Sequence, residues 1–231
     1  MSRALEAAAT KALAADEREF WLTVWHEAGH GLINRVHGLA VESLQALRPS
    51  EHRSGRRVFE RDGMPVQEAW GLCDDETQPW VQVRDGLCRP PVERDWVLAH
   101  IAANVAGPVA EHLWRHDRVL QRQVFWTHHP LRGITYRHCQ DDDLRDACAN
   151  AALLYPQRSA QNWLVRQQVH RISRYCQAEP VWQCLARIAD ALAISGYLSG
   201  VDLDALIELS PDIEDIQNIP PHSTNPTLNA R

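Results

Sequence analysis

The chain has 231 residues, a formal net charge of −6 at pH 7 and an isoelectric point near 6.0. Its 45% hydrophobic and 23% charged residues are ordinary for a soluble globular protein, and the acidic balance argues against nucleic acid as a partner. No run reaches the ~18 uncharged apolar residues of a membrane helix, so no membrane association is expected. Residues 2–18 do not resemble a signal peptide and the six cysteines form no Cys-x-x-Cys pair, which predicts free thiols and a cytoplasmic location.

The first predicted element covers residues 3–37, as one or two helices that end near Gly38. Between Trp21 and Val36 apolar residues recur at spacings of three and four, without proline. This stretch contains the pentapeptide His26-Glu27-Ala28-Gly29-His30. Residues four apart share one face of a helix, so both imidazoles can reach a single metal ion. We expect Gly29 to remove side-chain bulk beside that ion.

The residue types in the pentapeptide predict hydrolytic chemistry. In this pattern the two histidines bind zinc, and Glu27 accepts a proton from the attacking water. A catalytic zinc site needs a third protein ligand and keeps its fourth position for water or substrate. Spacing leaves the third ligand open among Glu111, His112, Asp141–Asp143, His128, His129 and His138.

A small β structure is expected after the motif helix. Residues 41–47 and 57–60 are short alternating runs, and the turn-forming segment 49–55 between them predicts a hairpin. An edge strand there would let an extended substrate add itself through backbone hydrogen bonds. Residues 61–91 are predicted to be an irregular insertion over the cleft, with a further strand at 80–83.

Helices dominate the remainder. A helical pattern at 92–116 is expected to break near Ala106-Gly107-Pro108, because proline begins helices more readily than it continues them. A second irregular insertion, 117–140, carries four candidates for stabilising an oxyanion. Helices are predicted at 142–154, 158–178, 180–195 and 202–209, followed by a disordered tail at 211–231. The four candidates are His128, His129, Tyr136 and His138.

Three segments, in this order, resemble the peptidase domain of the FtsH-type ATP-dependent zinc metalloproteases. The pentapeptide matches His-Glu-Ala-Gly-His, residues 105–111 (Val-Ala-Gly-Pro-Val-Ala-Glu) match the family's Ala-Gly helix, and residues 142–147 (Asp-Asp-Leu-Arg-Asp-Ala) match Asn-Asp-Leu-x-x-Ala. Residues 188–203 are similar to the closing helices. The family has Arg where this chain has Pro108, and Asn where it has Asp142.

The resemblance implies a third ligand and a fold. It implies that Asp143 completes a Zn²⁺ site with His26 and His30, and that Glu111 lies near the site, where it would orient a ligand histidine. The implied fold is mainly α (α+β): a zincin-like helical domain over residues 1–210, with a small hairpin or sheet beside the metal-binding helix. The family's ATPase module and membrane anchor have no counterpart here, and no phosphate-binding loop occurs.

The sequence therefore predicts a stand-alone, ATP-independent zinc metallopeptidase acting on flexible or unfolded polypeptide. A separate ATPase or a homo-oligomer would be its further partners. Two alternatives stay open: a non-catalytic, zinc-stabilised interaction module, and a peptidase specific for one regulatory protein. In the latter class the third ligand is usually a glutamate, which would be Glu111.

Overall fold

A computed structural model describes residues 3–59, 63, 65–66, 69, 71–75, 78–88, 91–128 and 142–210, the side chains of residues 3–13 and of Asp142 excepted. Over these residues the fold is mainly helical with a small antiparallel sheet, as predicted. Within the same ranges, no helix combines the length and the apolar character that crossing a bilayer requires.

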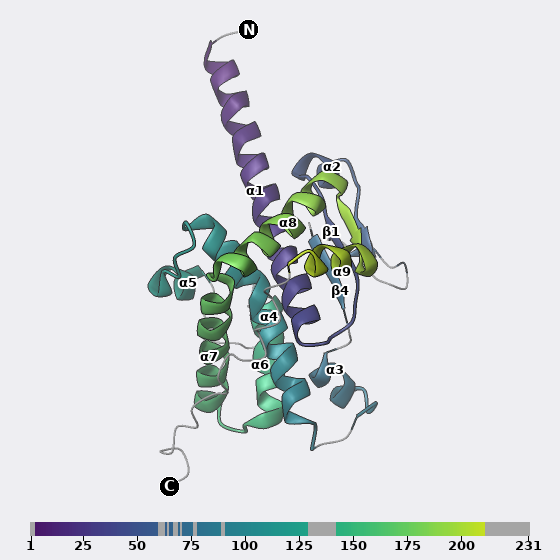
Figure 1. Cartoon of the computed structure of the whole chain (residues 1–231). Coiled ribbons are helices and arrows are strands. Elements are labelled where there is room, and N and C mark those ends of the chain that lie inside the picture. Colours follow the sequence, from purple (N-terminus) through teal and green to yellow (C-terminus); the bar gives the residue numbers. More distant parts are fainter. Residues whose placement is uncertain are drawn as a thin grey trace.

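Helix α1 (Arg3–Val36) runs through the middle of the molecule, and its N-terminal part projects from the body (Figure 1). It is one helix of 34 residues, or about 50 Å at 1.5 Å per residue. Its second half is apolar on several sides, with Phe20, Val24, Ala28 and Leu32 in the core. The helix ends at Val36, close to the predicted stop at Gly38, which has a φ of +73° and precedes a 2.9 Å hydrogen bond from the amide of Leu39 to the carbonyl of Asn34.

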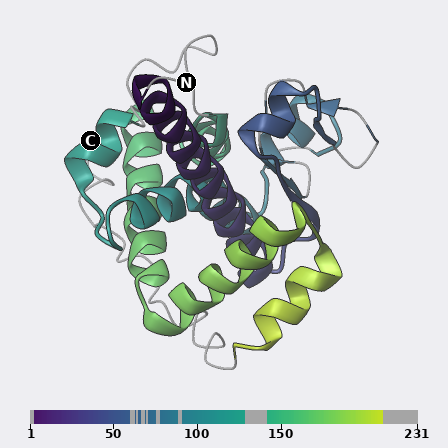
Figure 2. The same cartoon turned by 90° about the horizontal axis from the view of Figure 1, so that it is seen from above.

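Helix α4 (Arg94–Arg115) packs against α1 and is itself almost fully buried from Ala99 to Ala110. It also packs against α6 (Asp142–Leu154) and α7 (Arg158–Cys176). Helix α8 (Glu179–Ser195) covers α1 from another side, where Trp25 and Trp182 stack with ring centroids 4.5 Å apart. Seen from above, α1 lies between α7 and α8 on one side and the sheet-bearing segment on the other (Figure 2).

The main sheet has the strand order β4-β1-β5 and is antiparallel throughout. It consists of β1 (Val41–Ala46), β4 (Gly71–Asp75) and β5 (Tyr197–Ser199). Both β1 and β4 contact α1. The sheet thus lies beside α1, and among the described residues β4 is one of its two edge strands.

The smaller elements complete the described chain. Helix α9 (Gly200–Glu208) begins at Ser199, whose side chain accepts a hydrogen bond from the amide of Asp202. A salt bridge of 2.8 Å between Arg35 and Asp204 ties this helix to the end of α1. The other elements are α2 (Pro49–Arg53), β2 (Val58–Phe59), β3 (Pro65–Val66), α3 (Pro79–Arg84) and α5 (Arg122–His128).

The predicted hairpin of residues 41–47 with 57–60 is wrong. Strand β1 pairs instead with β4 and β5, and β2 pairs with β3 in a separate two-stranded ribbon. The connection is not a simple turn, because Pro49 starts a short helix, a position that suits the fixed φ of proline. The partner that β1 does use, β4, lies within the segment predicted to be an irregular insertion.

The two predicted insertions carry regular structure where they are described. Residues 80–83, expected to be a strand, belong to α3, which Pro79 opens at its first turn, and α5 lies within 117–140. Helix α4 does not break at residues 106–108 but continues through Pro108. A proline inside a helix costs about 3 kcal/mol, and the burial of α4 between α1, α6 and α7 offsets that cost. The predicted tail, 211–231, lies outside the described residues.

Candidate metal centre

Two imidazole nitrogens and one carboxylate oxygen converge beside α1. The Nε2 atoms of His26 and His30 are 3.1 Å apart, and Oδ2 of Asp143 lies 2.9 Å from the first and 3.3 Å from the second. The helical spacing of four places the two rings one turn apart, and Asp143 arrives from the first turn of α6. These three residues form a group that could hold a metal ion.

The opposite nitrogen of each ring fixes which tautomer is present. Nδ1 of His30 lies 2.8 Å from the carbonyl oxygen of Ala103, and Nδ1 of His26 lies 3.2 Å from Oε2 of Glu111. Both partners only accept hydrogen bonds, so each Nδ1 carries the proton and donates it. In the neutral rings both Nε2 atoms therefore present a lone pair toward Asp143. A positive charge among these three atoms stabilises the arrangement, and it can be supplied by a metal cation or by a proton on Nε2 of His26, whose pKa Asp143 and Glu111 raise.

The spacing of these atoms fits a small divalent metal. Tetrahedral coordination with bonds of about 2.0–2.1 Å places neighbouring ligand atoms about 3.3 Å apart. The three observed separations, 2.9, 3.1 and 3.3 Å, are close to that value. Three protein ligands leave a fourth position for water or substrate, as in catalytic rather than structural zinc sites.

The electrostatics of the group agree with cation binding. Burial favours the neutral acid of Asp143, but the rings of His30 and His26 outweigh it and hold the pKa of this carboxyl far below its usual range. Burial likewise opposes the charged form of His26, yet Asp143 and Glu111 raise its pKa well above the ordinary value. Asp143 is therefore a carboxylate at neutral pH, which a metal ligand must be.

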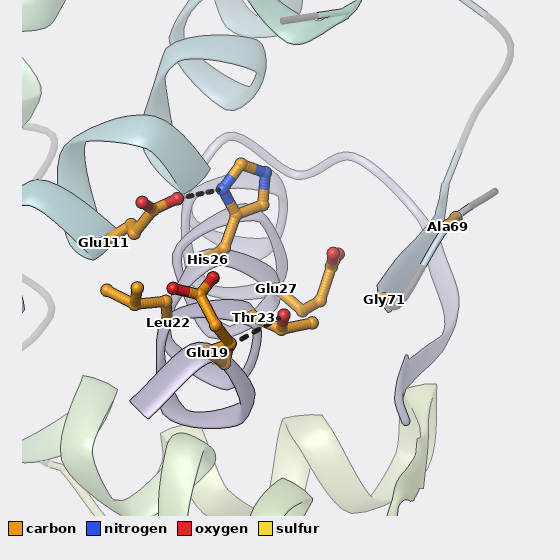
Figure 3. A pocket seen from close by; sticks show the side chains of 8 residues that line it. All are labelled: Glu19, Leu22, Thr23, His26, Glu27, Ala69, Gly71 and Glu111. Atoms are coloured by element: carbon orange, nitrogen blue, oxygen red, sulfur yellow. Dashed lines mark hydrogen bonds and ion pairs between the residues drawn. The ribbon is translucent and has the colours of Figure 1, made fainter. Parts of the chain in front are cut away.

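Glu27 lies beside the three ligands but is not one of them. Its side chain is directed toward Gly71 of β4 and borders a pocket that His26 and Glu111 also line (Figure 3). Only 7% of Glu27 is exposed, and this burial raises its pKa from 4.5 to about 7. A carboxyl group with a pKa near neutrality is suited to accept a proton and to return it.

Two glycines let the backbone approach these side chains. A Cβ atom on Gly107 of α4 would collide with the Nε2 atoms of both His30 and His26, and one on Gly71 would collide with the carboxylate of Glu27. Gly29, expected to make room for the metal, serves another purpose: its Cβ would lie 2.6 Å from the carbonyl oxygen of Ala106 and 2.7 Å from Cβ of Ala110. Gly29 thus permits the close crossing of α1 and α4, and Gly107 makes room at the ligands.

The remaining candidates from the sequence are placed as follows. Glu111 contacts the Nδ1 side of His26 and pairs with Arg115 at 2.8 Å, so it lies behind a ligand. His112 is turned elsewhere, since its Nε2 accepts a hydrogen bond from the amide of Gln121. Nδ1 of His128 donates to the carbonyl of Val124 within α5, and the residue is exposed. The other candidates lie outside the described side chains: Asp141, Asp142, His129, Tyr136 and His138.

Sequence reasoning missed three contributors to this site. The carbonyl of Ala103 fixes the tautomer of His30, Arg115 holds Glu111, and Gly71 brings β4 against Glu27. A contact made by a backbone carbonyl cannot be predicted from residue types, because every residue has one. Arg115, however, stands four residues after Glu111, a spacing that indicates an ion pair on a helix.

Comparison with known proteins adds no family to this geometry. No family model matches the sequence, and a search of curated proteins finds no significant match. The case for a function therefore depends on the site itself.

Proposed function

We propose that this chain is a zinc metallopeptidase that hydrolyses peptide bonds in flexible or unfolded polypeptide without ATP. The observation that carries the proposal is the convergence of two Nε2 atoms and the Asp143 carboxylate within 3.3 Å of one another, with the buried carboxyl of Glu27 next to them. His26, His30 and Asp143 would hold the zinc ion. When bound, zinc would lower the pKa of its water to ~7 and polarise a carbonyl group.

The chain's own residues account for the other parts of the reaction. Glu27 accepts the proton of the attacking water and passes it to the leaving amine, a role for which its pKa of about 7 is suited. Glu111 and the carbonyl of Ala103 orient the two rings, and Arg115 holds Glu111. Both histidines already hold their Nδ1 proton toward these partners, so each can bind the metal through Nε2 without changing its tautomer.

Strand β4 supports a peptide as the substrate. It is an edge strand of its sheet, and its first residue, Gly71, packs directly against Glu27. An extended chain can pair with such an edge through backbone hydrogen bonds. A peptide in that position would bring its own carbonyl groups past Glu27 and the Nε2 atom of His26. A folded segment could not pair in this way, so flexible segments are the proposed targets.

The substitution Glu27→Gln tests the proposal. Glutamine keeps the size of the side chain but cannot accept the proton, so hydrolysis of an unfolded protein such as casein should fall by about 10²- to 10⁴-fold. Zinc content, measured by elemental analysis, should stay at the wild-type level because Glu27 is not a ligand. Cleavage by the variant at the wild-type rate would show that another group is the base.

The same measurements separate the non-catalytic alternative. A wild-type protein that binds one equivalent of zinc and cleaves no unfolded substrate would be an interaction module stabilised by the metal. The position of Glu111 disfavours the class in which a glutamate is the third ligand, since its carboxylate contacts the Nδ1 atom of His26 and not the Nε2 side.

A further inference from the structure

A pocket of about 260 Å³ lies beside α1 and the start of β4, and two residues of the candidate site, the ligand His26 and Glu27, line it (Figure 3). Pockets that accept drug-sized ligands typically measure ~300–1,000 Å³. The smaller volume suits a single amino-acid side chain. Its lining comes from α1, from α4 and from the segment that leads into β4: Glu19, Leu22, Thr23, His26, Glu27, Ala69, Gly71 and Glu111.

Three carboxylates line this pocket, and two of them already contact other groups of the site. Glu111 contacts His26 and Arg115, and Glu27 lies buried against Gly71 where the reaction would occur. The third, Glu19, is exposed, and its carboxylate has no hydrogen-bond or ion-pair partner within the described part of the chain. Its backbone carbonyl accepts a 3.2 Å hydrogen bond from Thr23. Glu19 therefore brings to the pocket a negative charge that no described residue pairs with.

The position of Glu19 determines how long a substrate side chain must be to reach its carboxylate from His26. Glu19 and His26 are seven residues apart on α1, which places them on one face of the helix and about 10 Å apart along its axis. In Figure 3 the Glu19 side chain runs along the helix toward His26. A long side chain that starts near His26 could therefore end beside the Glu19 carboxylate.

The wall between the two ends is less polar. Leu22, which is 4% exposed, and Thr23 lie between Glu19 and His26 on the lining of the pocket. Lysine and arginine have the matching character, because an apolar stem of three or four methylene groups ends in a positive charge. An acidic side chain would be repelled by Glu19, and a short apolar one would leave its carboxylate unpaired.

We propose that Glu19 gives the protein a preference for peptides with lysine or arginine beside the scissile bond. This inference rests on the proposed peptidase function. The stem of the basic side chain would pack on Leu22 and Thr23, while its charged end pairs with Glu19. Glu19 acts on binding and not on the chemical step, so it is a specificity-determining residue.

Binding to a non-cleaving protein tests the inference directly. The zinc-loaded Glu27→Gln variant is titrated with decapeptides that differ only in a central arginine, norleucine or glutamate. We expect the arginine peptide to bind about tenfold more tightly than the norleucine peptide, and the glutamate peptide to bind more weakly than either. Adding Glu19→Gln should reduce the arginine preference to less than twofold.

Glu17→Gln is the matched control, because it removes the same charge two residues away on the same helix. Glu17 pairs with Arg48 at 3.1 Å and does not line the pocket. The arginine preference should therefore survive this change. The substitution Glu19→Arg should reverse the order so that the glutamate peptide binds best, a gain that general damage to the fold cannot produce.

Cleavage of the same peptides by the otherwise wild-type protein separates the two proposals. If the arginine preference depends on Glu19 but no peptide is cleaved, Glu19 still selects basic side chains for binding and the peptidase proposal fails. If peptides are cleaved in a Glu27-dependent manner without a basic preference, the peptidase proposal holds and the inference is overturned. Equal binding of the arginine and norleucine peptides, or a preference that survives Glu19→Gln, also overturns the inference.

Discussion

His26 and His30 differ in what stands behind them, although both direct Nε2 to the same point. His26 donates from Nδ1 to the carboxylate of Glu111, whereas His30 donates to the carbonyl of Ala103. A charged acceptor makes the imidazole a stronger electron donor than a neutral one does. His26 is therefore expected to be the stronger ligand, and its strength depends on Arg115, which holds Glu111 in place.

Asp143→Ala should weaken zinc binding by at least about 100-fold, since outer contacts of a metal site alone contribute 10- to 100-fold in affinity. The fold should remain, because α6 is anchored by Leu144, Ala147 and Ala151, which are all buried. Competition with a chromophoric chelator measures the affinity. Asp190→Ala, an exposed acid on α8, is the control and should bind zinc normally. Undiminished affinity in Asp143→Ala would remove this carboxylate from the ligand set.

At the scale of elements, the crossing of α1 and α4 determines how near the backbone comes to the ligands. Gly29 lets α1 approach the backbone of α4 at Ala106, and the next residue of α4, Gly107, faces both Nε2 atoms. The same crossing brings the carbonyl of Ala103 to His30 and the carboxylate of Glu111 to His26. One helix pair therefore supplies two ligands and both of the groups that orient them.

Gly107→Ala should reduce zinc affinity tenfold or more while leaving the metal-free fold largely intact. The added Cβ would force both imidazole tips to move, but alanine favours a helix over glycine by about 1 kcal/mol. Thermal denaturation with and without zinc measures both effects: we expect a normal midpoint without metal and a lost or diminished rise with it. Gly29→Ala gives the contrasting result, a lower midpoint without metal, because its Cβ meets the backbone of α4. A full zinc-dependent rise in Gly107→Ala would contradict the assignment.

The long helices could be placed from the sequence because their periodic apolar patterns are long, whereas the short helices α2, α3 and α5 were not predicted. The sheet could not, since the partners of β1 are distant in the chain and short: β4 has five residues and β5 three. In α3 the alternation of Trp80-Val81-Gln82-Val83 favours a strand, but Pro79 and the contact with α6 produce a helix. Continuation of α4 through Pro108 likewise depends on tertiary packing.

The site was predictable to the extent that it is local. The spacing of His26 and His30 follows from one helix, so the sequence alone brings them together. Asp143 is 117 residues from His26, and only the family resemblance indicated it among several acids and histidines. Which nitrogen of each imidazole faces the metal depends on contacts with α4, and a local sequence pattern in α1 cannot predict those contacts.

At the scale of the whole molecule, one buried and two half-buried acids gather around the metal centre. Glu27, Asp75 and Asp143 influence one another's ionisation, with the rings of His26 and His30 among them. Without a cation, the negative charges of these three carboxyl groups repel one another, and only the two imidazoles are present to compensate them in a poorly solvated region. A divalent ion relieves this repulsion, so its binding free energy adds to the stability of the entire fold.

Asp75, at the end of β4, is like Glu27 a member of this group whose charge opposes folding. Burial raises its pKa from 3.8 to about 6, and the amide of Asn34 donates to it at 2.9 Å. A raised pKa means that the folded state binds the proton more tightly than the unfolded state does. The resulting stability is fully present below pH 3.8 and is lost as the pH rises through about 6. The difference corresponds to up to about 3 kcal/mol.

Asp75→Asn should therefore stabilise the metal-free protein at pH 7.5 by up to about 3 kcal/mol and change little near pH 4. Asparagine keeps an acceptor for Asn34, and its amide adds a donor next to the Oδ1 atom of Asn34, which is buried without a partner. Urea denaturation in the presence of a chelator, from pH 4 to pH 8, measures the effect. Asp190→Asn on exposed α8 should follow the wild-type curve. Because the ionised form of Asp75 is the costly one, a variant that is less stable than wild type at pH 7.5 would show that this carboxylate is compensated within the fold.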